Sequence, residues 1–235
     1  MEILMVLTSH GELGDTGKKT GFWLEEFSAP YYTFLDADVR VTIASPKGGQ
    51  PPIDPKSDLP ENQTEFTRRL QADAAAQSKL ANTRKLENVA ADGFDAIFFP
   101  GGHGPLWDLA GNATSIELVE GFVSDDKPVC AVCHAPAVLL DVRGKDGRYL
   151  VTGKRVTGFT NAEEEAVGLT AIVPFLLENR LKLRDAIFSN GAPWAPYVQV
   201  DGKLVTGQNP ASSRPAADEL LKLVRAAEKP WRPRS

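Results

Sequence analysis

The chain is poor in cysteine, in clustered basic residues and in long apolar runs, and each shortage excludes a class of protein. Its 235 residues include two cysteines, too few for a disulfide framework. No run of lysine and arginine exceeds two residues and the net charge is −5, so no nucleic-acid partner is expected. The apolar stretch Ile3–Leu7 is too short for a signal peptide or a membrane span. We therefore expect a cytoplasmic protein with no membrane partner.

What is present indicates an α/β protein. Short apolar runs alternate with amphipathic stretches, a pattern typical of βα units that build a mostly parallel central sheet. The hydrophobic content of 42% suffices for one core, so we expect a single domain over residues 1–235. The expected strands are Ile3–Leu7, Val39–Ala44, Ala96–Pro100, Pro128–Val132, Arg155–Thr157, Ala186–Ser189 and a hairpin over Tyr197–Gly207. The expected helices are Gly21–Leu35, Thr64–Leu80, Ile116–Val123, His134–Val142, Pro174–Leu181 and Ala211–Ala227.

A segment rich in glycine and proline interrupts this alternation at Pro46–Pro60. Two polar helical pieces follow it before the next strand. We interpret residues 46–90 as a small cap inserted over the carboxyl ends of the strands, where α/β sheets hold their sites. The last residues, 229–235, are expected to form a loose tail.

Both cysteines lie in the stretch KPVCAVCHAPAVLL, which spans Lys127–Leu140. Their spacing resembles a redox pair. However, Cys130 falls inside the expected strand, and residues three apart in extended chain lie roughly 10 Å from each other, whereas the Cα atoms of a disulfide lie within about 7 Å. A redox pair is therefore disfavoured, and Cys130 is expected to be a packed, inert thiol.

Cys133 falls at the turn from strand to helix and is the candidate nucleophile. A nucleophile elbow needs small residues two positions before and after it, and here these are Ala131 and Ala135. The corresponding neighbours of Cys130, Pro128 and Val132, are bulky. A helix beginning at His134 would stabilise the Cys133 thiolate through its amide dipoles and lower the pKa of the thiol.

A thiolate that attacks a carbonyl needs hydrogen-bond donors for the developing oxyanion. The segment FFPGGHGPLWDL places Gly101, Gly102 and His103 directly after the strand that ends at Pro100, and glycines there let backbone N–H groups approach a ligand. We expect the N–H groups of Gly102 and His134 to form the oxyanion hole, with Gly101 and His103 as further substrate-binding candidates.

Two glutamates are candidate acid–base groups. On a helix, Glu26 falls within the apolar arc that contains Phe22, Trp23 and Phe27, whereas Glu25 points away from it. A carboxyl on an apolar face should have a raised pKa, as a general acid or base requires. The alternative is a glutamate at the rim of the face, with its carboxyl in water.

The second glutamate is Glu164, in TGFTNAEEEAVGL. It either orients the His134 imidazole or forms a helix cap together with Asn161. Sequence spacing does not decide between the two.

Two further patterns fail. The segment GDTGKKTG does not match a phosphate-binding loop, because Glu12 and Lys19 stand where glycine and serine or threonine are required. The three histidines, His10, His103 and His134, are too scattered in sequence to predict a metal site.

Five segments in order along the chain, LTSHGELGDTGKKTGFWLEEFSAPYYTF, FFPGGHGPLWDL, AVCHAPAVLL, GKRVTGFTNAEEEAVG and VTGQNPASS, resemble the ThiJ/PfpI superfamily. The resemblance implies a class I glutamine amidotransferase-like, flavodoxin-like three-layer sandwich with helices on both faces of the sheet. By position, Cys133 matches the family's nucleophile, His134 its histidine, Glu26 its helix-borne glutamate and Glu164 its triad acid. One residue departs from the usual pattern, since Ala135 replaces the glycine of C-H-G-P.

More narrowly, the segments resemble the glyoxalase III and heat-shock chaperone-like subgroup. This implies a glutathione-independent glyoxalase that needs no cofactor or metal, takes a small dicarbonyl substrate such as methylglyoxal, and forms a homodimer. Removal of glycation adducts would use the same residues. The alternatives left open are a stress-response holding chaperone in which Cys133 senses peroxide, and a cysteine peptidase or amidase.

Overall fold

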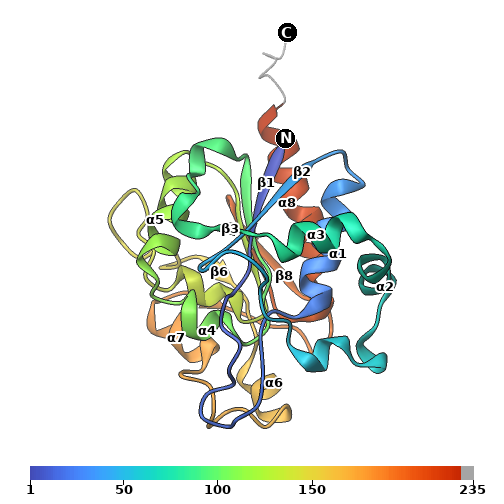
Figure 1. Ribbon diagram of the computed structural model, residues 1–235. Helices are drawn as coiled ribbons and strands as arrows, with labels where there is room; N and C mark the ends of the chain where they lie inside the picture. The colour runs from blue at the N-terminus through green and yellow to red at the C-terminus, as the bar shows by residue number, and fades with distance from the viewer. Residues whose placement is uncertain (229–235) are drawn as a thin grey trace.

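A computed structural model describes residues 1–228 and shows a central seven-stranded sheet (Figure 1). The strand order is β3-β2-β1-β4-β5-β9-β8. Every neighbouring pair is parallel except β8 and β9, which form an antiparallel hairpin. The strands are β1 Glu2–Val6, β2 Arg40–Ser45, β3 Arg84–Lys85, β4 Ala96–Phe99, β5 Val129–Val132, β8 Val198–Asp201 and β9 Leu204–Gly207. The tail expected at residues 229–235 lies outside the described part of the chain.

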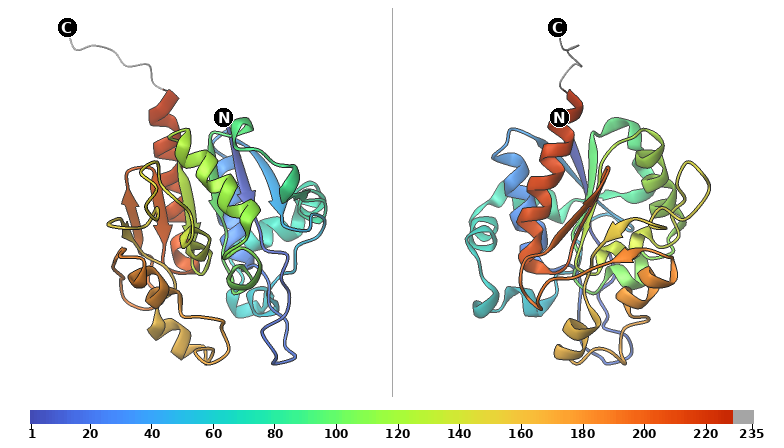
Figure 2. Two further views of the ribbon diagram at one scale, coloured as in Figure 1. Left: turned by 90° about the vertical axis from the view of Figure 1, so that its left-hand side faces the viewer. Right: turned by 180° about the vertical axis from the view of Figure 1, so that it is seen from behind.

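Helices cover both faces of the sheet, so the predicted three-layer architecture is confirmed (Figure 2). One face carries α1 Leu24–Leu35, α2 Glu65–Ala72, α3 Ala74–Ala81 and α8 Ser213–Glu228. The other carries α4 Pro105–Asp108, α5 Ala113–Ser124, α7 Leu177–Leu183 and the 3₁₀ helix η5 Ala135–Leu139. The helix α6, Asn161–Ala166, lies at the carboxyl end of the sheet, beside the site described below.

The side chains of the central strands pack into two hydrophobic cores, one on each face of the sheet. Side chains of a strand alternate between the two faces of its sheet. In β1, Ile3 and Met5 pack into the core beneath α1 and α8, whereas Leu4 and Val6 pack into the core beneath α5. All four side chains are buried, which explains why the sequence of this strand is a continuous apolar run.

The expected strands at Arg155–Thr157 and Ala186–Ser189 do form, but they do not join the main sheet. They pair with each other as β6 Arg155–Val156 and β7 Ile187–Phe188 in a separate two-stranded sheet. The two-residue strand β3 was not predicted, because its residues, Arg84 and Lys85, are exposed and carry no apolar pattern.

Four expected helices differ clearly from the observed ones, and one of them, expected at Pro174–Leu181, is observed as α7, Leu177–Leu183. The helix expected at Gly21 begins at Leu24, because residues 21–23 run in extended conformation beside the loop around Pro52. The helix expected over Thr64–Leu80 divides at Asp73, whose carboxylate caps α3 through the Ala76 N–H. The α-helix expected at His134–Val142 is wrong: the segment is the short 3₁₀ helix η5, with Pro136 in its first turn.

The segment 46–90 contains the 3₁₀ turns η1 Pro55–Asp58 and η2 Pro60–Asn62, then α2, α3 and β3, and last the 3₁₀ turn η3 Leu86–Asn88. Its residues from Glu61 to Thr64 form part of the wall of a cavity at the carboxyl ends of the strands. None of the helices described in residues 1–228 has the length and apolar composition of a membrane-spanning segment.

Candidate active site

The carboxyl ends of β4, β5 and β9 meet at one edge of the sheet, and the start of α1 approaches the same point. A cavity of about 430 Å³ lies there. Parallel sheets hold their ligands at this edge. The cavity is lined by Trp23, Glu25, Glu26, Glu61, Asn62, Gln63, Thr64, Gly102, His103, Cys133, His134, Phe159, Val167, Trp194, Asn209, Pro210, Ala211 and Arg214.

Cys133 occupies a sharp elbow after β5. Its φ is 60°, a left-handed conformation that costs free energy for any residue with a Cβ atom. The backbone on both sides holds it there: the Cys133 N–H donates to the Gly207 carbonyl oxygen at 2.9 Å, and the Cys133 carbonyl accepts from the Phe159 N–H at 2.8 Å. The side chain is 3% exposed. The sulfur therefore has one fixed position on the cavity wall.

Cys130 has no part in this site. Both cysteines are free thiols. Cys130 is buried in β5 on the face covered by α8, with its sulfur 4.0 Å from the Ala216 carbonyl oxygen. It is the packed thiol that the sequence predicts, and no redox pair forms.

His134 and Glu164 extend a chain of polar contacts that begins at the Cys133 sulfur. The Cys133 Sγ lies 3.4 Å from the Nδ1 atom of His134, and His134 Nε2 lies 2.7 Å from Glu164 Oε2. Burial, and then the neighbouring His103, lower the pKa of His134 to about 4, so the ring is neutral at pH 7. Its single N–H donates to the carboxylate, because a carboxylate can only accept. Nδ1 is then free to accept the thiol proton.

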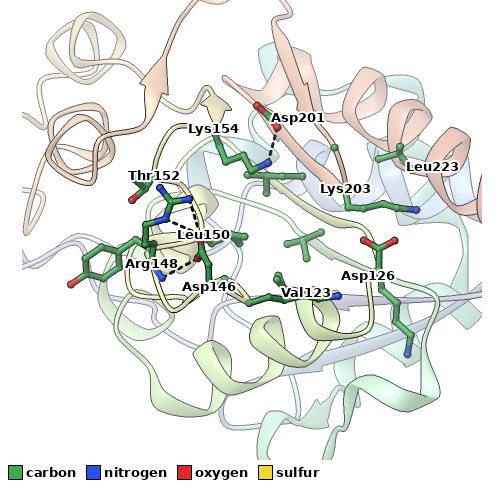
Figure 3. A pocket seen from close by; sticks show the side chains of 17 residues that line it. Val123, Asp126, Asp146, Arg148, Leu150, Thr152, Lys154, Asp201, Lys203 and Leu223 are labelled. Atoms are coloured by element: carbon green, nitrogen blue, oxygen red, sulfur yellow. Dashed lines mark hydrogen bonds and ion pairs between the residues drawn. The ribbon is translucent and has the colours of Figure 1, made fainter.

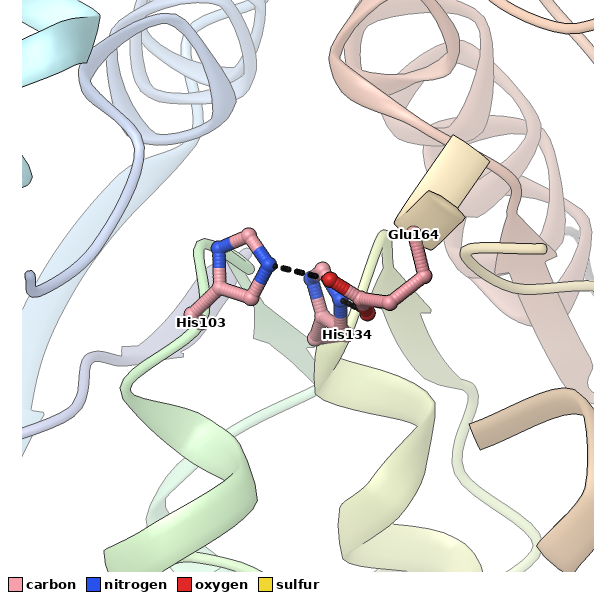
Figure 4. Close-up of side chains that lie close together, drawn as sticks. All are labelled: His103, His134 and Glu164. Atoms are coloured by element: carbon pink, nitrogen blue, oxygen red, sulfur yellow. Dashed lines mark hydrogen bonds and ion pairs between the residues drawn. The ribbon is translucent and has the colours of Figure 1, made fainter. Parts of the chain in front are cut away.

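His103 holds the other oxygen of the same carboxylate. Its Nε2 lies 2.8 Å from Glu164 Oε1, and its ring lies 4.0 Å from the ring of His134. Both imidazoles thus turn a nitrogen toward Glu164 (Figure 4). Burial alone would raise the pKa of Glu164, but the two histidines outweigh it and hold the pKa well below its usual value. The carboxylate is ionised and fixed on both sides.

The helix-cap alternative for Glu164 is wrong. The capping box of α6 uses the preceding residues: the Thr160 side chain accepts from the Glu163 N–H, and the Glu163 carboxylate accepts from the Thr160 N–H. Glu164, one position later, is left to face the histidines.

His103, His134 and Glu164 also form a possible metal-ligand set, since one atom from each lies within 4.8 Å of the others. The argument that the histidines are too scattered is therefore wrong for His103 and His134. His10 lies elsewhere, with its ring stacked on Trp107. Two histidines and a carboxylate suit Zn²⁺, but a cation there would occupy the groups that His134 and Glu164 use to serve the thiol.

Glu26 reaches the sulfur from α1. Its side chain is fully buried, and its Oε2 accepts from the Gly101 N–H at 2.9 Å. Its Oε1 is buried without a hydrogen-bond partner among residues 1–228, and the carboxyl lies near enough to Cys133 for each group to influence the pKa of the other. Burial raises the pKa of Glu26 to about 8, so the carboxyl is protonated at pH 7. The alternative of a glutamate in water at the rim is wrong.

Glu25 does not point away from the site as expected. It lines the cavity and accepts hydrogen bonds from Thr64 and Ser28. Burial raises its pKa as well. The arc argument fails for Glu25 because the cap segment, which carries Thr64, covers that side of the helix.

The low thiol pKa predicted from a helix dipole is also wrong. Burial raises the pKa of Cys133, and a negative charge on Glu26 would raise it further, while the nearby backbone of Gly102 acts in the opposite direction. At neutral pH the Glu26 carboxyl keeps its proton, so its repulsion is absent. The thiolate must form by proton transfer to His134, because no long helix points at the sulfur.

The two glycines after β4, Gly101 and Gly102, lie so close to neighbouring atoms that neither position has room for a side chain. A Cβ atom on Gly101 would lie 2.6 Å from Glu26 Oε2 and 2.7 Å from Cys133 Cβ. Gly102 has a φ of 92°, and a Cβ atom there would lie 2.4 Å from the Gly21 carbonyl oxygen. Only glycine lets this turn pass between α1 and the elbow.

The structure thus brings all seven predicted site residues to one cavity wall or directly behind it. Sequence reasoning missed several lining residues, among them Phe159, Trp194 and Arg214. Phe159 follows a recognisable T-G turn, but its ring gives no chemical hint of a site. Trp194 lies in an irregular segment, and no pattern around it predicts that it would return to the cysteine.

A second cavity, of about 720 Å³, lies at the opposite edge of the sheet, by the first residues of β5 and β9 (Figure 3). Two ion pairs, Lys154–Asp201 and Arg148–Asp146, lie in its wall. Its walls carry no cysteine or histidine, so the candidate chemistry belongs to the smaller cavity.

Comparison with known proteins agrees with this geometry. A family model described as the DJ-1/PfpI family matches residues 19–223. The chain belongs to the DJ-1/PfpI family. The resemblance indicated by the sequence motifs is therefore confirmed.

Several known proteins are similar to the chain over most of its length. Glutathione-independent glyoxalase HSP31 of Saccharomyces cerevisiae is 31% identical over 229 residues, covering 92% of this chain and 94% of the relative. Glyoxalase 3 of Candida albicans is 29% identical over 233 residues, covering 94% and 97%. Among solved structures, the Rapid Encystment Protein 24 kDa of Francisella tularensis has a TM-score of 0.90 at 37% identity, covering 95% of this chain and 98% of that one.

Proposed function

We propose that the chain is a glutathione-independent glyoxalase that converts methylglyoxal and water to lactate. One observation carries the proposal: the Cys133 sulfur lies 3.4 Å from the His134 Nδ1 atom, and the buried Glu26 carboxyl lies beside the same cysteine. The lowered pKa of His134 and the raised pKa of Glu26 favour an imidazole that accepts a proton and a carboxyl that supplies one. The similarity to two glyoxalases over nearly the whole chain supports the same reaction.

In the first step His134 Nδ1 takes the thiol proton, and the ionised Glu164 stabilises the imidazolium. The thiolate adds to the aldehyde carbon C1, and the carbonyl oxygen becomes an alkoxide. In this proposal the N–H groups of Gly102 and His134 donate hydrogen bonds to that oxygen. Donors fixed in advance at such a position lower the barrier to addition.

Glu26 then moves protons between the two carbons. It protonates the alkoxide, and as a carboxylate it removes the hydrogen of C1 as a proton, while the C2 oxygen takes the proton held by His134. The product is an enediol. Glu26 next delivers its proton to C2 and regains one from the C1 hydroxyl, which leaves a thioester. C1 is oxidised and C2 reduced within one molecule, so no external oxidant or cofactor is needed.

Hydrolysis completes the cycle. His134 removes a proton from water as it attacks the thioester, and returns that proton to the departing Cys133 sulfur. Lactic acid leaves and ionises in solution. Each group has then returned to its starting state.

The test is an assay of the purified protein with methylglyoxal, without glutathione or added metal. We expect lactate to form, and Cys133→Ala to abolish it. Cys130→Ala is the matched control and should retain turnover, since that thiol lies within β5, beneath α8 and outside the cavity. Lactate formation that persists in Cys133→Ala would rule out the mechanism.

The same variants separate the alternatives. A holding chaperone would suppress client aggregation whether or not residue 133 is cysteine, and an amidase would release ammonia or amine from amide substrates. A thiol that is 3% exposed on the wall of a cavity favours a small carbonyl compound over a polypeptide. The homodimer stays a prediction, which the mass of the protein in solution would test.

A further inference from the structure

Trp194 is held in an unusual backbone conformation beside the active-site cavity. Its φ is 64°, in the left-handed region, where a bulky aromatic residue is an outlier. Its side chain is also among the most exposed large apolar groups of the described residues, at 48%. Such strain persists only where the surrounding structure enforces it, and it gathers at sites that bind ligands.

Glu163 enforces this conformation. Its buried carboxylate accepts from the Trp194 N–H at 2.9 Å, and the same oxygen accepts from the side chains of Gln208 at 3.1 Å and Asn209 at 2.8 Å. The other oxygen holds Thr160 at the start of α6. One carboxylate therefore ties the loop of Trp194 to both α6 and the segment that follows β9.

The indole lines the same cavity as Cys133. Its ring meets Phe159 edge to face at 5.8 Å, and Phe159 lies 4.3 Å from the ring of His134. An aromatic wall thus runs from the acid–base pair toward the solvent. The cavity, at about 430 Å³, falls in the range of pockets that hold ligands far larger than methylglyoxal.

We propose that Trp194 is a specificity residue, and that the site favours 2-oxoaldehydes whose ketone carbon carries a planar aromatic substituent. The aldehyde carbon lies at the Cys133 sulfur, and the substituent packs against the Phe159–Trp194 wall, where aromatic rings pair offset or edge to face. This inference rests on the proposed glyoxalase function and narrows its substrate class.

The experiment compares phenylglyoxal with methylglyoxal in the wild-type protein and in Trp194→Ala, Trp194→Phe and Leu183→Ala. We expect Trp194→Ala to lower kcat/KM for phenylglyoxal by roughly 10-fold or more, mainly through KM, because an aromatic contact is lost. The value for methylglyoxal should stay within about 3-fold, and Trp194→Phe should restore most of the loss. Leu183, an exposed apolar residue outside the cavity, should alter neither value.

Equal changes for the two substrates, or no change for phenylglyoxal, would overturn the assignment. If the wild-type protein converts neither compound, the proposed function is wrong. The binding of an aromatic ligand then tests the Phe159–Trp194 wall independently of turnover. Mandelate, the product expected from phenylglyoxal, should then bind to the Cys133→Ala protein roughly 10-fold more tightly than to Cys133→Ala/Trp194→Ala. Equal affinities would refute the aromatic wall itself.

Discussion

Replacing Glu26 by glutamine should make the protein more stable at neutral pH while removing its activity. Glutamine has the shape of glutamate and can still accept from the Gly101 N–H, but it carries no charge at any pH. The wild-type carboxyl, by contrast, has to stay protonated in the folded protein at a pH where the unfolded chain would ionise it.

The size of the effect follows from the pKa. Folding raises the pKa of Glu26 from 4.5 to about 8, so between these values the folded state binds more protons than the unfolded state, and stability falls as the pH rises. A pH of 7 is about 2.5 units above the pKa of Glu26 in the unfolded chain. Keeping this carboxyl protonated in the folded protein therefore lowers the stability by about 3 kcal/mol at pH 7. The side-chain NH₂ of the glutamine would face the Cys133 thiol, which is a weak hydrogen-bond acceptor. This poorly satisfied donor would reduce the gain in stability by about 1 kcal/mol.

Thermal unfolding of the two proteins from pH 5 to pH 8 provides the measurement. We expect Glu26→Gln to unfold roughly 4–8 °C higher than wild type at pH 7, and the difference to shrink or reverse near pH 5. The lowered pKa of His134 makes stability rise with pH between about 4 and 6.5, but it acts equally in both proteins and cancels. A difference in stability that does not change with pH would refute the reasoning, as would a variant that is less stable throughout. Lactate formation should fall by roughly 10²–10⁴-fold, as for loss of a general acid–base group.

Three further predictions concern the same site. The proposed mechanism needs neutral His134 and protonated Glu26. The plot of kcat/KM against pH should therefore be bell-shaped, with an acid limb near about 4 and a basic limb near about 8. If Glu26→Gln retained the basic limb, the assignment of that limb to Glu26 would be contradicted. Gly101→Ala should abolish activity and destabilise the fold because its Cβ atom meets Glu26 and Cys133, whereas Gly93→Ala, with no atom within 4 Å, should leave the activity unchanged in the same assay. Dialysis against a chelator should leave the activity unchanged. Added Zn²⁺ should inhibit reversibly by binding His103, His134 and Glu164. Loss of activity on dialysis against the chelator would instead indicate a required metal.

The sequence predicts the sheet and the cysteine elbow well, because both depend on local patterns. The continuous apolar runs of β1, β4 and β5 can form only buried strands. The elbow at Cys133 follows from the small residues around it and is observed in its positive φ. The burial of Glu26 is also predicted correctly, although of the three aromatic residues in the predicted arc only Phe27 lies on the helix, because α1 begins at Leu24.

Other features depend on contacts between distant segments and could not be predicted. Glu25 faces the cavity because Thr64 lies over it, and nothing near Glu25 in the sequence reveals this. The segment after His134 has the apolar residues expected of a helix, yet it forms only the 3₁₀ helix η5, which ends at Leu139. The strained Trp194 depends on Glu163, which lies 31 residues away.

Glu163 and Glu164 are adjacent in the chain and serve different tasks. The first anchors the loop that carries Trp194, and the second holds the two imidazoles. If the proposed function and the role of Trp194 hold, a substitution that rotates or shortens α6 should disturb substrate choice and proton transfer together. Evolution of a new substrate range would be easiest through side-chain replacements within the Trp194 loop, which leave this pair in place.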